Sequence, residues 1–348
     1  MILRTTNGGT QWLTPPSPTT EWLLAVTFPE PLYGFAVGDN GPIVATTNGG
    51  LQWFVQPTGI SGSFEAVAFA NRTHGAAVGW YGTIVRRTNG GASWTRQASG
   101  TLNEWFYGVA FPTPDTGTVV GTSGWILQTT DGGLTWIRRA TAWSNHLLGV
   151  HFSDAQHGTI VGTVSLILRT TDGGITWYQQ TSGTTNNLYD VHFVTRQHGT
   201  IVGFNGTILH TTNGGSTWTR QQGGTTARLY SVFFSDTSTG TIVGAQGTIL
   251  RTTTGGVTWV RDERTSGDQP LRLLLEKNYP NPFNGTTTIR FSAPDIRSHV
   301  RLRVFDLLER EVATLVDAVK HAGETHTPLL HLRPRNPTLP RQHTSHFS

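Results

Sequence analysis

The segment that begins at Leu188 alternates apolar and polar positions in the manner of four short β-strands. Leu188, Val191 and Phe193 mark its first run, and two runs rich in threonine, isoleucine and valine follow at 199–203 and 206–211. A fourth run comes after an Asn-Gly-Gly turn. β-Branched residues favour strands, and Asn-Gly or Gly-Gly pairs favour hairpins. No run of ten or more residues has helical spacing, so the segment predicts a four-stranded antiparallel sheet.

This pattern recurs along the chain with a regular period. An eight-residue phrase such as TTDGGLTW (129–136) or TTNGGSTW (211–218) closes each copy, and its tryptophan returns every 41 or 42 residues. Four strands in a repeat of about 41 residues are typical of a propeller blade. We therefore predict an all-β fold, a β-propeller of the seven-bladed type over residues 1–261. The closing tryptophans are Trp12, Trp53, Trp94, Trp136, Trp177, Trp218 and Trp259.

The first residues of the chain fall inside a repeat. Met1–Thr6 aligns with Thr248–Thr253, which is the third strand of a blade. The sequence thus predicts six complete blades and an N-terminal half blade that lacks its two inner strands. A start that has been assigned too late, or a fragmentary gene, would explain the missing strands and the lack of a signal peptide.

The repeated phrase has the chemistry of a turn. Asp131, Asp172 and the asparagines at equivalent positions can accept hydrogen bonds from the backbone just ahead of them. The paired glycines permit positive φ. Seven copies argue against catalysis, since an active site is rarely needed seven times. We expect the tryptophans to wedge between blades.

The phrase resembles the Asp-box, whose pattern Ser/Thr-x-Asp-x-Gly-x-Thr-Trp is fully matched at 129–136 and 170–177. Asp-boxes occur in sialidases, sortilin-type receptors and related propellers. The whole repeat, GTIVGxxGTILRTTNGGxTW, is more similar to the photosystem II assembly and stability factor family. That resemblance implies a seven-bladed, non-enzymatic propeller that holds a partner protein.

The C-terminal part changes character. Residues 262–270 read as a polar linker, and the turn-rich motif NYPNPFN follows at 278–284. With this motif, residues 271–323 resemble the sorting domain of type IX secretion cargo, a small β-sandwich that is incomplete here. The resemblance implies export through the type IX machinery, to the cell surface or the medium. Residues 324–348 are rich in proline, histidine and arginine and predict a disordered or frameshifted tail. The sorting motif is Asn278, Tyr279, Pro280, Asn281, Pro282, Phe283 and Asn284.

Composition excludes several functions. Only 13% of residues are charged and the net charge is +4, too dilute to indicate nucleic acid. Without cysteine there is no disulfide or thiolate metal site, and no apolar run reaches the roughly 20 residues of a transmembrane helix. His74, His157 and His198 occupy equivalent places in different blades and predict turn hydrogen bonds. His151 and His192 could line the channel, but a pair is a poor metal site. We expect no metal and no cofactor.

Two sets of residues could bind a partner. Arg4, Arg86, Arg169 and Arg251 share one register and could grip carboxylates, although solvated outer strands are the favoured interpretation. The second set lies on links that a propeller places on the face opposite the Asp-boxes. These aromatic residues suit peptide or glycan binding, or fill gaps between blades. They are Trp22, Trp80, Tyr81, Trp105, Trp125 and Trp143.

The sequence therefore predicts an exported, non-enzymatic propeller that acts as a protein- or glycan-binding scaffold. One alternative is an Asp-box glycoside hydrolase of the sialidase kind, although no motif pairs two carboxylates. A second alternative is a photosystem assembly factor proper.

Overall fold

The computed structural model describes residues 1–261 apart from 10, 61 and 89–92, and short strands beyond them. Contacts divide the chain into two units, Met1–Asp262 and Glu263–Ser348.

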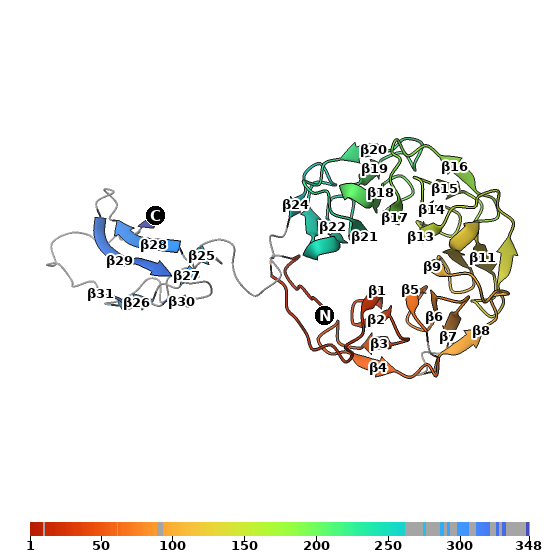
Figure 1. Cartoon of the computed structure of the whole chain (residues 1–348), viewed down its shortest axis with the longest axis horizontal. Helices are drawn as coiled ribbons and strands as arrows, with labels where there is room; N and C mark the ends of the chain where they lie inside the picture. Colours follow the sequence, from red (N-terminus) through yellow and green to blue (C-terminus); the bar gives the residue numbers. More distant parts are fainter. Residues whose placement is uncertain are drawn as a thin grey trace. The chain divides into compact units, whose positions relative to one another are not determined.

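The first unit contains six antiparallel sheets of four strands each, arranged in a ring (Figure 1). The first three sheets are β1 (Leu23–Glu30), β2 (Tyr33–Gly38), β3 (Ile43–Thr46), β4 (Phe54–Gln56); β5 (Phe64–Phe69), β6 (His74–Gly79), β7 (Ile84–Thr88), β8 (Thr95–Gln97); and β9 (Phe106–Ala110), β10 (Gly117–Gly121), β11 (Ile126–Thr129), β12 (Ile137–Arg139). The next three are β13 (Leu147–Phe152), β14 (Gly158–Gly162), β15 (Ile167–Thr170), β16 (Tyr178–Gln180); β17 (Leu188–Phe193), β18 (Gly199–Gly203), β19 (Ile208–Thr211), β20 (Thr219–Gln221); and β21 (Leu229–Phe234), β22 (Gly240–Gly244), β23 (Ile249–Thr252), β24 (Val260–Arg261).

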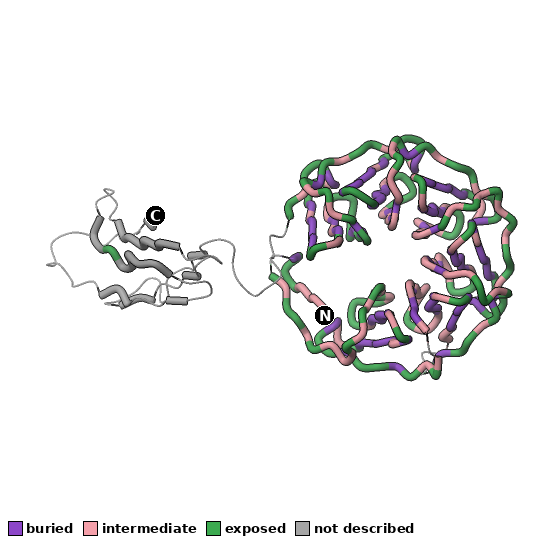
Figure 2. Tube along the Cα trace, viewed as in Figure 1, coloured by how far each residue is buried: buried purple, intermediate pink, exposed green. Residues whose placement is uncertain are grey.

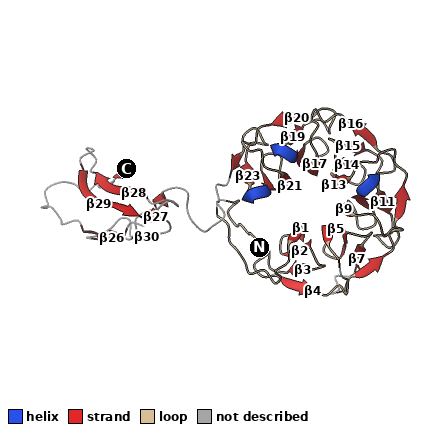
Figure 3. Ribbon diagram, viewed as in Figure 1, coloured by secondary structure: helices blue, strands red, loops and turns tan. Residues whose placement is uncertain are grey.

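Within each sheet the strands pair in chain order, with the first strand nearest the centre of the ring (Figure 1). The described residues contain no α-helix. Single turns of 3₁₀ helix join the second and third strands of three blades (Figure 3), namely η1 (Thr122–Gly124), η2 (Phe204–Gly206) and η3 (Ala245–Gly247). The prediction of an all-β propeller with six complete blades is confirmed.

The hydrophobic core lies between neighbouring blades, because the middle strands are buried on both faces (Figure 2). One cluster joins Phe35 and Val37 of the first blade to Phe64, Val67 and Trp94 of the second. Such a sandwich explains why the second strands read as continuous apolar runs, without the alternation of a half-exposed strand.

An aromatic pair holds the two edges of every complete blade together. The phenylalanine that ends the innermost strand meets the Asp-box tryptophan edge to face, with ring centroids 5.8 to 6.0 Å apart. The glycine that opens the second strand makes room for the phenylalanine; a Cβ on Gly199 would lie 2.5 Å from the ring of Phe193. The pairs are Phe28–Trp53, Phe69–Trp94, Phe111–Trp136, Phe152–Trp177, Phe193–Trp218 and Phe234–Trp259.

The N-terminal segment lies between the first and sixth sheets. Arg4 and Leu13 form an antiparallel bridge with backbone bonds of 2.8 and 2.6 Å. Ile2 packs against the buried cluster of Ala36, Val44 and Trp53 in the first blade. On the other side, a Cβ on Gly9 would lie 2.7 Å from Cδ of Arg251 in the sixth blade. This bridged pair corresponds to the outer half of a blade; the seven-bladed type stays a prediction.

The described residues of the second unit form three small sheets. Their orders are β25-β27-β30, β26-β31 and β29-β28-β32. The sorting motif Asn278–Asn284 lies outside the described residues, and the predicted limits 262–270, 271–323 and 324–348 stay predictions. The strands are β25 (Leu274–Leu275), β26 (Thr286–Thr288), β27 (Phe291–Ser292), β28 (Ser298–Phe305), β29 (Glu311–Lys320), β30 (Thr325–His326), β31 (Leu329–His331) and β32 (His346–Phe347).

Candidate functional site

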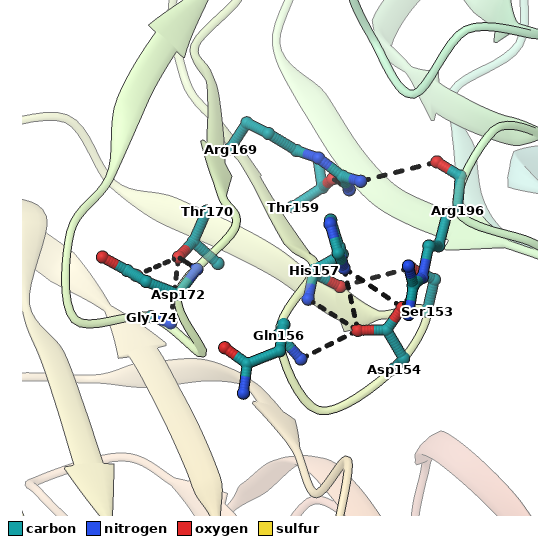
Figure 4. Close-up of polar contacts among 10 residues, drawn as sticks. All are labelled: Ser153, Asp154, Gln156, His157, Thr159, Arg169, Thr170, Asp172, Gly174 and Arg196. Atoms are coloured by element: carbon teal, nitrogen blue, oxygen red, sulfur yellow. Dashed lines mark hydrogen bonds and ion pairs between the residues drawn. The ribbon is translucent and has the colours of Figure 1, made fainter.

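The Asp-box is a closed hydrogen-bonded turn between the third and fourth strands of a blade. Figure 4 shows the box of the fourth blade, where Thr170 Oγ1 donates to Asp172 Oδ1 (2.7 Å) and accepts from the backbone N–H of Gly174 (2.9 Å). Thr176 donates to Asp172 from both its backbone N–H and its hydroxyl. The third box lies largely outside the described residues, at 89–92.

These bonds explain the chemistry of the box carboxylates. Burial alone would raise the pKa of Asp172, but hydrogen bonds from Thr176 and Thr170 hold it at about 2. Bonds from Thr135 and Thr129 likewise hold the pKa of Asp131 well below its usual range. A carboxylate this strongly ionised and internally satisfied suits a turn lock and not a general acid.

The arginines of the third strands contact the next blade, which differs from the favoured expectation of solvated side chains. Arg4 Nε donates to the carbonyl of Gly49 (2.6 Å), and Arg86 Nε donates to the carbonyl of Gly132 (2.5 Å), in each case inside the neighbouring Asp-box. Arg169 is 3% exposed. The arginines of this register therefore link neighbouring blades, because the long side chain brings its guanidinium to a carbonyl across the seam between two blades.

Three aromatic residues come together at the seam between the second and third blades. Trp80 follows β6, and Trp105 precedes β9; their rings stack with centroids 4.7 Å apart and planes 10° apart. Tyr81 meets both rings edge to face at 6.4 Å. The Trp80 indole N–H donates to Glu65 Oε1 (2.5 Å), which fixes the orientation of the stacked pair. We call Trp80, Tyr81 and Trp105 the aromatic cluster.

The backbone of Tyr81 is strained. Its φ is +54°, and its side chain is 57% exposed. Equivalent turn positions in the other blades also have positive φ, and they carry Asn40, Ser123, Val164, Asn205 and Gln246. A bulky side chain in this region is uncommon and costs free energy. The tyrosine is therefore held in place at a local cost, as residues of binding sites often are.

Carboxyl groups lie beside the aromatic cluster. Glu65 lies at a β-bulge of β5, where the register shifts between Phe64 and Ala66. Burial raises the pKa of Glu65, the Trp80 hydrogen bond lowers it, and nearby Asp39 raises it further. Glu104 accepts a hydrogen bond from Thr122 next to Trp105. This part of the face combines aromatic rings with carboxyl groups.

The other predicted aromatic residues are not part of this cluster. Trp125 packs partly buried against the core between the second and third blades, with the Arg138 guanidinium 4.0 Å from its ring centroid. Trp143 packs against the next core cluster. Trp22 is 76% exposed and does not pair with another aromatic ring of the described residues.

A half-buried carboxylate on an innermost strand was missed by the sequence analysis. Asp190 accepts from the Ser231 hydroxyl (2.8 Å) and from the backbone N–H of Val232 (2.9 Å) in the next blade. Burial raises the pKa of Asp190 although these bonds lower it. The available signal was an aspartate at a repeat position where the other blades have glycine, alanine or serine.

The histidines act as hydrogen-bonding or packing groups. His157 Nδ1 lies 2.9 Å from Asp154 Oδ1, and Arg196 Nε donates to Asp154 Oδ2 across the seam (Figure 4). The His151 and His192 rings are 4.6 Å apart, and burial lowers their pKa values to about 3 and about 4.

Within the described ranges no three His, Asp or Glu side chains gather as metal ligands. No helix in the described part has the length and apolarity to cross a membrane.

Fold and turns together define an Asp-box β-propeller. A family profile described as "Photosynthesis system II assembly factor YCF48" matches residues 177–261. A structure of YCF48 bound to D1 peptide matches with a TM-score of 0.60 and 19% identity, covering 78% of this chain and 89% of that chain. YCF48 from Cyanidioschyzon merolae gives 0.60 and 19%, covering 79% and 94%.

A glycoside hydrolase has a similar fold. The GH74 enzyme of Niastella koreensis matches with a TM-score of 0.59 and 16% identity, covering 69% of this chain and 45% of that chain. No curated protein sequence matches this chain significantly. The chain is thus a β-propeller that resembles the photosystem II assembly factor, and likeness at this identity shows the fold alone.

Proposed function

We propose that this protein is a non-enzymatic scaffold whose aromatic cluster binds an extended, basic segment of a partner protein. The observation that carries the proposal is the stacked Trp80–Trp105 pair with a strained, exposed Tyr81 beside it. Rigid aromatic groups with an exposed surface are typical anchors of protein recognition. The likeness to a propeller whose structure holds a peptide supports a protein partner in general.

The charges favour a basic partner. Glu65 and Glu104 contact or adjoin the aromatic cluster, and Asp39 lies close enough to raise the pKa of Glu65. Lysine and arginine side chains can pair with carboxylates and also lie over aromatic rings. An acidic or neutral glycan would gain only the stacking part of this attraction.

The carboxylates support a binding role over glycoside hydrolysis. A retaining or inverting glycosidase uses two carboxyl groups on either side of one bond. Burial raises the pKa of Glu65 in the second blade and of Asp190 in the fifth, so these two candidates for a general acid belong to different parts of the ring. Asp190 is also engaged by three donors of the protein itself.

The test compares two substitutions at equivalent turn positions. Tyr81→Asn removes the exposed ring and places asparagine where Asn40 and Asn205 already adopt positive φ. Val164→Asn makes the same change in the fourth blade, at a φ of +53°, and serves as the matched control. The wild-type protein and the Val164→Asn variant should be retained on immobilised peptides rich in arginine and aromatic residues. The Tyr81→Asn variant should be retained about tenfold less. Equal retention by both variants, or selective retention of glycans, would reject the proposal.

We also propose that the chain is exported by the type IX machinery through residues 271–323. The sequence motif at 278–284 supports this. In a bacterium with that machinery, protease added to intact cells should reach the propeller of the exported full-length protein. Deleting residues 278–284 should leave it protected inside the cell, whereas unchanged exposure would contradict the proposal.

A further inference from the structure

An open groove adjoins the aromatic cluster where the chain leaves the outermost strand of the second blade, β8. Its volume is about 750 Å³, and it is lined by Gly82, Arg96 and residues 97–103. Gly82 directly follows Tyr81 of the cluster, and the last lining residue lies two positions before Trp105. A ligand that lies on the cluster can therefore continue into this groove. We call it the outer groove.

The link that forms the outer groove is one residue longer than its equivalents in other blades. The backbone N–H of Gly82 donates to the carbonyl of Glu104 (2.7 Å). The equivalent bond of the fifth blade joins Gly206 to Ala227, which is one residue closer in sequence. The Asp-box tryptophan that follows the longer link accordingly comes 42 residues after its predecessor, whereas the other intervals are 41 residues. The groove thus belongs to an insertion that this blade alone carries.

The longer link carries side chains that the other links lack. Leu102 is 70% exposed, and the links of the next three blades have small polar residues at its position. Glu104 lies beside Trp105 and accepts a hydrogen bond from Thr122. The link therefore offers an apolar contact next to the groove and a carboxylate next to the cluster. The residues equivalent to Leu102 are Ser144, Thr185 and Thr226.

Arg96 is the charged group of the outer groove. Its side chain is exposed, and within the described part of the chain it has no hydrogen-bond or ion-pair partner. The equivalent Arg138 of the third blade lies over the ring of Trp125, 4.0 Å from the centroid. In the second blade Thr83 stands at the place of Trp125, so Arg96 has no ring to lie on. Its guanidinium is therefore free to pair with a carboxylate in the groove.

We propose that the outer groove binds an acidic residue of the partner segment whose basic and aromatic residues occupy the aromatic cluster. The inference rests on the proposed function and adds a second contact, which decides the direction of the bound segment. Glu65 and Glu104 attract basic groups at the cluster, whereas Arg96 attracts a carboxylate at the groove. A segment that lay in the opposite direction would bring like charges together at both places, which is unfavourable.

The experiment uses three synthetic peptides that share a core of arginine and tyrosine residues. The first has two glutamates before the core, the second has two glutamates after it, and the third has glutamines at both ends. Binding to the full-length chain is measured by calorimetry at low salt. One of the two glutamate peptides, and not the other, should bind about fivefold more tightly than the glutamine peptide, as one exposed ion pair allows.

Charge reversal in the groove provides the second arm. Arg96→Glu alters an exposed side chain, so the melting temperature should not change, and the favoured glutamate peptide should then bind more weakly than the glutamine peptide. Arg220→Glu makes the same change at the equivalent exposed position of the fifth blade, and this matched control should keep the preference of the wild type.

The glutamine peptide separates this inference from the proposed function, because it can reach only the aromatic cluster. If it binds the wild type and neither glutamate peptide binds more tightly, the groove inference is overturned and the proposed function stands. Equal tightening by both glutamate peptides, or a preference that survives in Arg96→Glu, would also overturn the inference. Failure of all three peptides to bind the wild type would reject the proposed function, and the groove inference with it.

Discussion

Replacing the same phenylalanine in the two terminal blades should have unequal effects on stability. Phe28 and Phe234 occupy equivalent positions on the innermost strands of the first and sixth blades and meet their tryptophans at 5.9 and 6.0 Å, close to perpendicular. Their exposures differ: Phe28 is 45% exposed and Phe234 is 4% exposed. The pair thus varies burial while the chemistry and the aromatic contact stay constant.

The magnitude follows from the area. A phenylalanine side chain carries about 200 Å² of surface, and burying it contributes about 25 cal/mol per Å². Truncating Phe234 to alanine should therefore cost about 5 kcal/mol, and truncating Phe28 about 3 kcal/mol, as upper values. The edge-to-face contact adds about 1 kcal/mol to each and cancels in the comparison. The expected difference is about 2 kcal/mol.

The assay is urea unfolding of both single variants, followed by far-ultraviolet circular dichroism. Blades of a repeat protein can unfold separately, so calorimetry should first establish that one transition is observed. A Phe28→Ala cost equal to that of Phe234→Ala would refute the reasoning, because it would mean that the first blade is covered on the face that carries Val26 and Phe28.

Three further predictions concern the glycines, the boxes and the buried histidines. Gly199→Ala should destabilise the propeller by about 2 kcal/mol, because the added Cβ would meet the Phe193 ring. A double-mutant cycle with Phe193→Leu, measured by urea unfolding, should show positive coupling between the two sites. Additive costs of the two substitutions would contradict this. Asp172→Asn should change stability by less than about 1 kcal/mol at neutral pH, since Asn213 makes the same turn with its amide. Asp172→Ala should clearly lower the melting temperature. A large loss of stability in Asp172→Asn would indicate a role beyond the turn. The pKa values of His151 and His192 are lowered by burial to about 3 and about 4 from 6.5. Below pH 6.5 the unfolded chain therefore takes up more protons, so stability is complete above that pH and falls as acid is added, by up to about 1.4 kcal/mol per pH unit for each histidine. His192→Phe should flatten this fall, and an unchanged acid limb would argue against it.

Much of the fold could be predicted because the repeat encodes it locally. The strand runs 188–193 and 199–203 coincide with β17 and β18, since β-branched residues between glycine turns leave few alternatives. The phenylalanine partners of the tryptophans also recur with the same period and could have been recognised as a pattern. Their contact could not, because Phe193 and Trp218 are brought together only when the blade folds across all four strands.

The candidate site was harder to predict. The sequence marked Trp80, Tyr81 and Trp105 together with Trp125 and Trp143, which belong to the same kinds of link. Only the packing of the seams separates a stacked pair such as Trp80–Trp105 from a ring that lies in the core cluster, as Trp125 does. The reason is that exposure depends on side chains from the neighbouring blade, which is about 41 residues away in sequence.

The sequence by itself determined the blade, its strands, its turn chemistry and the period of the ring, because these depend on residues a few positions apart. Tertiary structure alone decided which equivalent positions differ. Val243 and Val202 are the same residue in the same local pattern, yet one is 41% exposed and the other is fully buried. Burial is a property of the neighbour that packs against a residue, and a repeated sequence cannot state which of its copies lacks one.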